Sequence, residues 1–262
     1  MSQRKLVVVF AAFPGVTQLG FTGPHQVFSS LPGAQVIVAS GAGGTLESSG
    51  GLTFAGLRRL ADIAACDVIC VPGGRAVTDN AIQDQAFLGE LRRLAATAQF
   101  VTSVCTGSLA LGAAGLLRDK HAACPWAWRE TLALFGAIPD HGRVVRDGNI
   151  VTGGGVTAGI DFALSLVAEI AGPDVAQAIQ LQIEYAPAPP FESGSPETAP
   201  PAIRARLRQQ NEATVRQRRE AVEAARSTCG MKGQVDARAE TQLRILRQGL
   251  AAQRGGCANL FV

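Results

Sequence analysis

The chain has 262 residues, of which 47% are hydrophobic and 17% charged, a composition typical of a globular protein with a substantial core in one large domain or two small ones. Neither a run of 18 apolar residues nor a hydrophobic signal region occurs, so we expect a cytoplasmic protein without a membrane partner. Residues 1–200 carry 12 Lys and Arg against 16 Asp and Glu (net −4), and residues 201–262 carry 12 against 5 (net +7), so an acidic body precedes a basic tail.

The first 54 residues predict a strand, a helix and a second strand. Residues 6–12 are a continuous apolar run, as expected for a strand buried on both faces. A helix is predicted to begin at Thr22 or Gly23 and to end before Pro32. Residues 34–40 predict the second strand, and a glycine-rich loop follows it.

The next strand and helix show the same alternation. Residues 66–71 predict a third buried strand, which the turn Pro72-Gly73-Gly74 closes. Thr78 or Asp79 is predicted to cap a helix of about four turns, judged from its apolar spacing. A fourth strand is predicted over residues 99–104.

A reactive residue type stands where the fourth strand ends. A helix is predicted over residues 106–117, so Cys105 lies at a sharp turn from strand to helix, the arrangement known as a nucleophile elbow. Unpaired backbone N–H groups and the helix dipole favour a thiolate at such a position. Spacing alone also permits a buried, unreactive thiol, because free cysteines are among the most buried residues.

The segments after the elbow continue the mixed pattern. Residues 121–124 predict a short extended stretch, and residues 126–135 predict a helix. Asp147-Gly148 is a strong hairpin signal. Two further helices are predicted to end near Ile170 and Glu184.

Strands that alternate with helices predict an α/β fold with a mostly parallel sheet and helices on both faces. In such sheets ligands bind outside the carboxyl ends of the strands. The turns Pro14-Gly15 and Pro72-Gly73-Gly74, the pair Cys105-Thr106 and the run Gly153-Gly154-Gly155 all follow predicted strands. We therefore expect the thiol and several exposed backbone amides at one edge of the sheet.

The composition predicts few other kinds of site. The six cysteines form no CxxC pair and are expected to be reduced, and the three histidines stand in no metal-binding motif, so neither a disulfide framework nor a metal site is expected. Residues 186–201 are rich in proline and predict a linker, and residues 202–226 predict a solvated helix. The tail has no helix-turn-helix signature, so no nucleic-acid partner is expected.

Several segments resemble the DJ-1/PfpI superfamily: Phe13-Pro14-Gly15-Val16 with Thr22-Gly23-Pro24, Val71-Pro72-Gly73-Gly74, and the Cys105 elbow. Within the superfamily the chain is most similar to the isonitrile hydratases (cyclohexyl-isocyanide hydratases), in residues 101–109, 151–164 and 182–191. The resemblance covers residues 5–210. It implies a flavodoxin-like sandwich, which we place over residues 1–200. The charge and composition of residues 201–262 separately predict a basic helical tail with a disordered end.

The resemblance also implies a chemistry. The expected reaction of this hydro-lyase is the addition of water to an isonitrile, giving an N-substituted formamide without a metal or organic cofactor, in a homodimer. Cys105 is the expected nucleophile and forms a thioimidate with the substrate. Thr106 is expected to hydrogen-bond at the reacting group, and Gly20, Gly73 and Gly74 to line the substrate site.

Three segments depart from the family pattern. The glycine-rich turn reads Gly73-Gly74-Arg75-Ala76, where a Gly-Pro-Gly continuation is expected. Gly20 stands in the run Leu19-Gly20-Phe21-Thr22-Gly23-Pro24 where the family has an aspartate, and Pro125 stands where it commonly has a histidine. His25 is the candidate replacement for proton transfer, and the alternative for it is a histidine exposed on a surface helix. A non-catalytic sensor or binding protein is therefore the alternative function, and glyoxal hydration ranks lower because it usually needs both missing groups.

Overall fold

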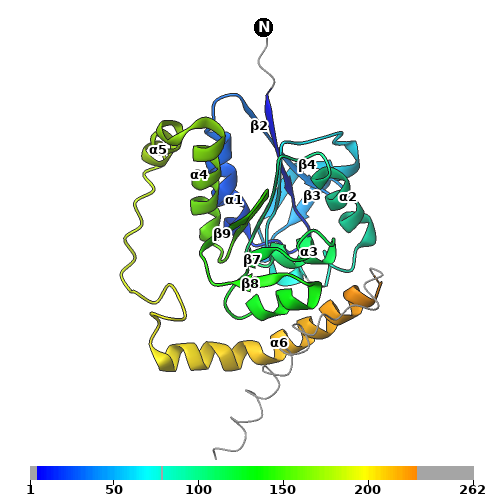
Figure 1. The fold of residues 1–262 in the computed structure, drawn as a ribbon, viewed down its shortest axis with the longest axis vertical. Helices are drawn as coiled ribbons and strands as arrows, with labels where there is room; N and C mark the ends of the chain where they lie inside the picture. The colour runs from blue at the N-terminus through cyan, green and yellow to red at the C-terminus, as the bar shows by residue number, and fades with distance from the viewer. Residues whose placement is uncertain (1–4, 78, 229–262) are drawn as a thin grey trace, which may run out of the picture.

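Six parallel strands form the central part of the sheet in the computed structural model, which describes residues 5–77 and 79–228 (Figure 1). The full sheet has eight strands in the order β3-β4-β2-β1-β5-β6-β10-β9. Only the two edge strands, β3 and β9, run antiparallel to their neighbours. The strands are β1 (Leu6–Ala11), β2 (Ala34–Ser40), β3 (Gly44–Glu47), β4 (Thr53–Arg59), β5 (Val68–Val71), β6 (Phe100–Val104), β9 (Val144–Asp147) and β10 (Ile150–Gly153).

Helices cover both faces of this sheet, as the sequence predicts (Figure 1). The helices α1 (Gln18–Ser29), α4 (Ala158–Ala171) and α5 (Pro173–Gln182) pack on one face. On the other face lie α2 (Gln85–Ala95), α3 (Gly107–Ala113), the 3-10 helix η3 (Arg129–Phe135) and part of α6 (Pro201–Thr228). The flavodoxin-like α/β sandwich is therefore confirmed.

Strand β1 shows why the apolar runs form the centre of the sheet. Val8, Val9 and Phe10 are fully buried. Side chains alternate between the faces of a strand, and Val9 contributes to one hydrophobic cluster while Val8 and Phe10 contribute to the other. A strand covered on both faces needs apolar residues at every position, which is why its sequence reads as an unbroken apolar run.

Helix α1 begins earlier than the sequence predicts. Its first residue is Gln18, with Thr17 as the N-cap, so the expected start at Thr22 or Gly23 is wrong. Pro24 lies inside the helix, where it cannot donate the usual backbone hydrogen bond. The earlier start places Gly20 within the helix rather than in a loop before it.

Helix α2 begins later than predicted. Its N-cap is Asp84, whose carboxylate accepts a hydrogen bond from the Phe87 backbone N–H at 3.0 Å. Asp79 therefore does not cap this helix, and Thr78, the other predicted cap, lies outside the described residues. Aspartate at this position satisfies one of the four N–H groups that a helix start leaves without partners.

The remaining connections agree with the predicted order of elements. A two-residue turn at Gly148, where φ is +64°, joins β9 to β10, as the hairpin signal predicts. The strands β7 (His121–Ala123) and β8 (Ile138–Asp140) form a separate two-stranded sheet. Within the described ranges, no helix is long and apolar enough to cross a membrane.

Helix α6 is present and largely exposed, as its composition predicts, but it also buries three residues against the rest of the molecule. It runs across the end of the molecule beneath η3 and contacts both η3 and α3 (Figure 1). Arg218, Val222 and Ala225 are buried, while most of its other described side chains are exposed. The predicted disorder at the end of the tail concerns residues 229–262, which lie outside the described residues.

Candidate active site

Cys105 lies between β6 and α3 in a backbone conformation that is unusual for a residue with a side chain. Its φ is +59°, in the left-handed region, which costs about 1–2 kcal/mol for an L-residue. Two hydrogen bonds hold this geometry: the Cys105 N–H donates to the Gly153 carbonyl at 2.8 Å, and the Ser108 hydroxyl donates to the Cys105 carbonyl at 3.0 Å. The chain therefore makes the sharp turn from strand to helix that the sequence predicts.

The loop after β5 approaches this turn so closely that only glycine fits at its centre. A Cβ atom placed on Gly73 would lie 2.6 Å from the Thr106 backbone nitrogen and 2.8 Å from the Cys105 Cβ. Real Cβ atoms do not approach other atoms at such distances. The predicted site residues Gly73, Cys105 and Thr106 are thus in direct contact.

Thr106 ties the same loop to the elbow through its side chain. Its hydroxyl accepts a hydrogen bond from the Gly74 N–H at 3.0 Å and donates one to the Gly74 carbonyl at 3.1 Å. Thr106 is 3% exposed, so these bonds form away from water. The Gly74 N–H is therefore engaged by Thr106 rather than directed at the thiol.

The thiol of Cys105 experiences opposing influences. Burial has the largest effect and raises the pKa of the Cys105 thiol, since the thiolate loses hydration. Hydrogen bonds from the backbone and side chain of Thr106 lower the pKa, and so does the positive charge of Arg218. Burial dominates, so the net pKa is raised in the free protein.

Gly20 lies close to the elbow on helix α1. A Cβ atom at this position would lie 3.7 Å from Cγ1 of Val104, the residue before Cys105, which is an ordinary van der Waals distance. Gly20 is buried, and its backbone conformation is one that other residues adopt. The position therefore has room for the start of a side chain directed toward the end of β6.

Two other candidate positions have structural surroundings of their own. His25 is half-buried, with its ring 5.7 Å from those of Phe10 and Phe21, and burial lowers its pKa. It is therefore packed among aromatic rings rather than exposed on the surface. Pro125 lies before η3, where its carbonyl accepts a hydrogen bond from the Trp128 N–H at 2.8 Å.

The structure also places residues near the thiol that sequence reasoning did not select. The charge of Arg218 acts on both Cys105 and Cys124, and both thiols are buried. The buried residues of α6 are spaced by four and three positions, at 218, 222 and 225. This spacing could have predicted a buried face on the helix. However, an arginine at the first of the three positions usually indicates an exposed one.

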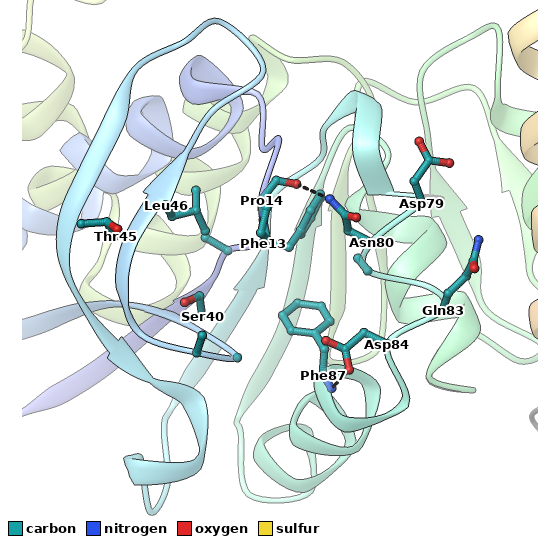
Figure 2. A pocket seen from close by; sticks show the side chains of 14 residues that line it. Phe13, Pro14, Ser40, Thr45, Leu46, Asp79, Asn80, Gln83, Asp84 and Phe87 are labelled. Atoms are coloured by element: carbon teal, nitrogen blue, oxygen red, sulfur yellow. Dashed lines mark hydrogen bonds between the residues drawn. The ribbon is translucent and has the colours of Figure 1, made fainter.

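A pocket of about 450 Å³ opens at the carboxyl ends of β1 and β2 (Figure 2). Phe13 and Phe87 form part of its wall, and the Asn80 amide reaches across to donate a hydrogen bond to the Pro14 carbonyl at 3.0 Å. Cys105 is not among its lining residues. The pocket thus lies at the predicted edge of the sheet but is not lined by the thiol.

The described cysteines at positions 66, 70, 105 and 124 are all free. Within the described part of the chain, no group of three or more His, Cys, Asp or Glu residues is arranged to hold a metal ion.

Comparison with known proteins agrees with this geometry. Residues 5–169 match the DJ-1/PfpI family. The chain is 48% identical over 227 residues to an isonitrile hydratase from Pseudomonas putida, an alignment that covers 87% of this chain and 99% of that enzyme.

Solved structures point the same way. A ThiJ/PfpI family protein from Pseudomonas syringae superposes with a TM-score of 0.80 and 37% identity, over 86% of this chain and 91% of that one. Drosophila melanogaster DJ-1beta shares the fold, with a TM-score of 0.62 and 23% identity, over 70% of this chain and 100% of that one. The chain therefore belongs to the DJ-1/PfpI family.

Proposed function

We propose that this chain is an isonitrile hydratase that converts an isonitrile and water into an N-substituted formamide. The observation that carries the proposal is the 48% identity to the Pseudomonas putida isonitrile hydratase over nearly the whole length of that enzyme. The strained backbone at Cys105 supports it, because strain of this kind is frequent at catalytic positions.

The proposed chemistry uses Cys105 as the nucleophile. Its sulfur forms a bond to the isonitrile carbon, and the thiol proton ends on the same carbon, which gives a thioimidate. Water then adds to that carbon. The carbon–sulfur bond breaks, one proton of the water passes to the nitrogen and the other returns to the sulfur, so the formamide leaves and the thiol is restored.

The neighbouring residues have supporting roles in this proposal. Thr106 stabilises negative charge on sulfur, because its hydrogen bonds lower the pKa of Cys105. Gly73 allows the loop to approach the sulfur closely, and Gly74 fixes that loop through Thr106. Gly20 borders the substrate site beside the end of β6, where the absent side chain leaves room for a carboxylate as well as for substrate.

Formamide production from cyclohexyl isocyanide tests the function directly. We expect turnover that Cys105→Ala abolishes, with both proteins folded to the same extent by circular dichroism. If the native chain produces no more formamide than Cys105→Ala, the enzyme proposal fails. The alternative then takes its place. In it, the chain is a sensor or binding protein that keeps the family fold but has Gly20 and Pro125 where the family has its aspartate and histidine.

A Gly20→Asp variant tests whether a carboxylate is missing from the site. The Cβ atom fits beside Val104, and general acid or base catalysis typically contributes about 10²–10⁴ in rate. We expect Gly20→Asp to produce formamide faster than the native protein, by a factor that approaches this range. Gly20→Ala is the control for the added Cβ atom alone. An equal rate in the two variants would show that proton transfer does not pass through this position.

We also propose that the enzyme is a homodimer. Two large apolar side chains, Leu19 on α1 and Leu52 before β4, are 44% and 54% exposed. Their segments adjoin, because a Cβ atom on Gly50 would lie 3.0 Å from the Gln18 amide. Light scattering on the purified protein measures the mass, and a Leu19→Glu variant should shift it to the monomer if this face is the interface.

A further inference from the structure

Helix α6 brings a buried positive charge to the same end of the molecule as the elbow (Figure 1). Arg218 is 7% exposed, and its guanidinium carbon lies 4.2 Å from the centroid of the Trp128 ring. An arginine that stacks on an indole at this distance gains a cation–π interaction, which is stronger where water is excluded.

A hydrogen bond links Arg218 to the loop that contacts the thiol. Its Nη2 donates to the Arg75 carbonyl at 2.5 Å. Arg75 directly follows Gly74, whose N–H and carbonyl both bond to the Thr106 hydroxyl. Two adjacent residues of one turn are therefore held by two different elements, Gly74 by the elbow and Arg75 by α6.

Several charged and titratable groups act on Arg218. Asp79, Cys105 and Cys124 favour its charged form, while the Arg75 charge disfavours it. Burial is the largest influence and lowers its pKa. Arginine has the highest pKa of the ionisable side chains, so the guanidinium remains a cation at the pH at which enzymes work.

We propose that Arg218 is a positioning residue of the Cys105 site, which anchors the Gly74–Arg75 turn and brings a buried positive charge to the loop that contacts the elbow. This role makes α6 part of the site rather than an appendage of the α/β body. Its consequence for formamide production rests on the proposed function, whereas its effect on the thiol itself does not. The two can therefore be measured separately.

The rate of Cys105 alkylation by iodoacetamide, followed against pH, reports the thiolate without any isonitrile. Mass spectrometry of the Cys105 peptide separates this thiol from the other cysteines. We expect Arg218→Gln to move the midpoint of the profile upward by up to about one pH unit, because the hydrogen bonds from Thr106 lower the pKa of Cys105 more strongly than the Arg218 charge does. At a fixed pH below the midpoint, alkylation then slows by up to about tenfold.

Two further variants separate charge from packing. Arg216→Gln removes the same charge from an exposed position on the same helix, and its profile should match that of the native protein. Arg218→Lys keeps the charge but loses the planar group that stacks on Trp128. Its midpoint should stay within a few tenths of a unit of the native value, even if its melting temperature falls.

Three results would overturn the proposal. They are an unchanged midpoint in a folded Arg218→Gln, a shift of the same size in Arg216→Gln, and a shift in Arg218→Lys as large as in Arg218→Gln. If Arg218→Gln does not fold, the Arg218→Lys profile decides between charge and packing. A shifted midpoint in a protein that makes no formamide would leave the role of Arg218 intact and reject the hydratase function.

Discussion

Replacing Thr106 with valine keeps the shape of a buried side chain and removes its hydroxyl. In the native structure this hydroxyl bonds both to the Gly74 N–H and to the Gly74 carbonyl. The carbonyl keeps a second partner, because it also accepts a hydrogen bond from the Val77 N–H at 3.3 Å. The Gly74 N–H loses the partner that it has here, and an unpaired buried donor costs about 1–3 kcal/mol.

This cost sets the size of the expected effects. At about 2–4 °C for each kcal/mol in a domain of this size, Thr106→Val should melt roughly 2–12 °C below the native protein. The loss of the hydroxyl also removes an influence that lowers the pKa of Cys105, so the alkylation midpoint should rise. Formamide production should fall by about tenfold or more, because the loop beside the sulfur shifts.

Thermal unfolding and iodoacetamide alkylation measure the two effects, with Thr106→Ser as the matched control. Serine retains the hydroxyl and should stay close to the native protein in both assays. The reasoning is refuted if Thr106→Val melts and reacts like the native protein. It is also refuted if Thr106→Ser is as impaired as Thr106→Val, since the methyl group would then be the important part.

Three further changes have expected outcomes. Gly73→Ala should abolish formamide production and lower the melting temperature, because its Cβ atom would lie 2.6 Å from the Thr106 backbone nitrogen. Native activity in this variant would show that the loop after β5 does not lie this close to the elbow. Asp84→Ala should destabilise the protein by about 0.5–2 kcal/mol in urea unfolding through loss of the bond to the Phe87 N–H, whereas Asp84→Asn should stay near the native value. The pKa of Asp147 is lowered mainly by a backbone hydrogen bond, so the stability it contributes is present above the unfolded pKa near 4 and lost as the pH falls through the lower folded value. Asp147→Asn should accordingly melt below the native protein at pH 7, and the difference should shrink as the pH is lowered toward 2. A constant difference over this range would show that the carboxylate does not titrate this way.

The strands and the elbow could be predicted from the sequence because their determinants are local. Residues 6–12 must be apolar throughout if both faces of β1 are covered, and that pattern is visible without a structure. The turn at Cys105 follows from a strand pattern that changes directly into a helical one. The hairpin at Gly148 likewise follows from its own two residues.

The helix starts and the role of α6 could not be predicted, because several candidates satisfy the same local rule. Asp79 and Asp84 are both acceptable N-caps, and only packing against the sheet selects Asp84. Pro24 suggests a first turn, yet α1 includes it at an interior position. Arg218 reads as a surface residue until Trp128 and the Arg75 carbonyl are seen beside it.

Thr106 and Arg218, which both lower the pKa of Cys105, also both bind the Gly74–Arg75 turn. Thr106 holds Gly74, and Arg218 holds Arg75, so each group depends on a turn that the other also stabilises. Residues that share a support of this kind do not contribute independently. The double variant Thr106→Val with Arg218→Gln should therefore raise the alkylation midpoint by less than the sum of the two single shifts, because the first change already frees the turn. Shifts that add fully would mean that each group acts on the sulfur alone, and that the Gly74–Arg75 turn does not couple helix α6 to the elbow.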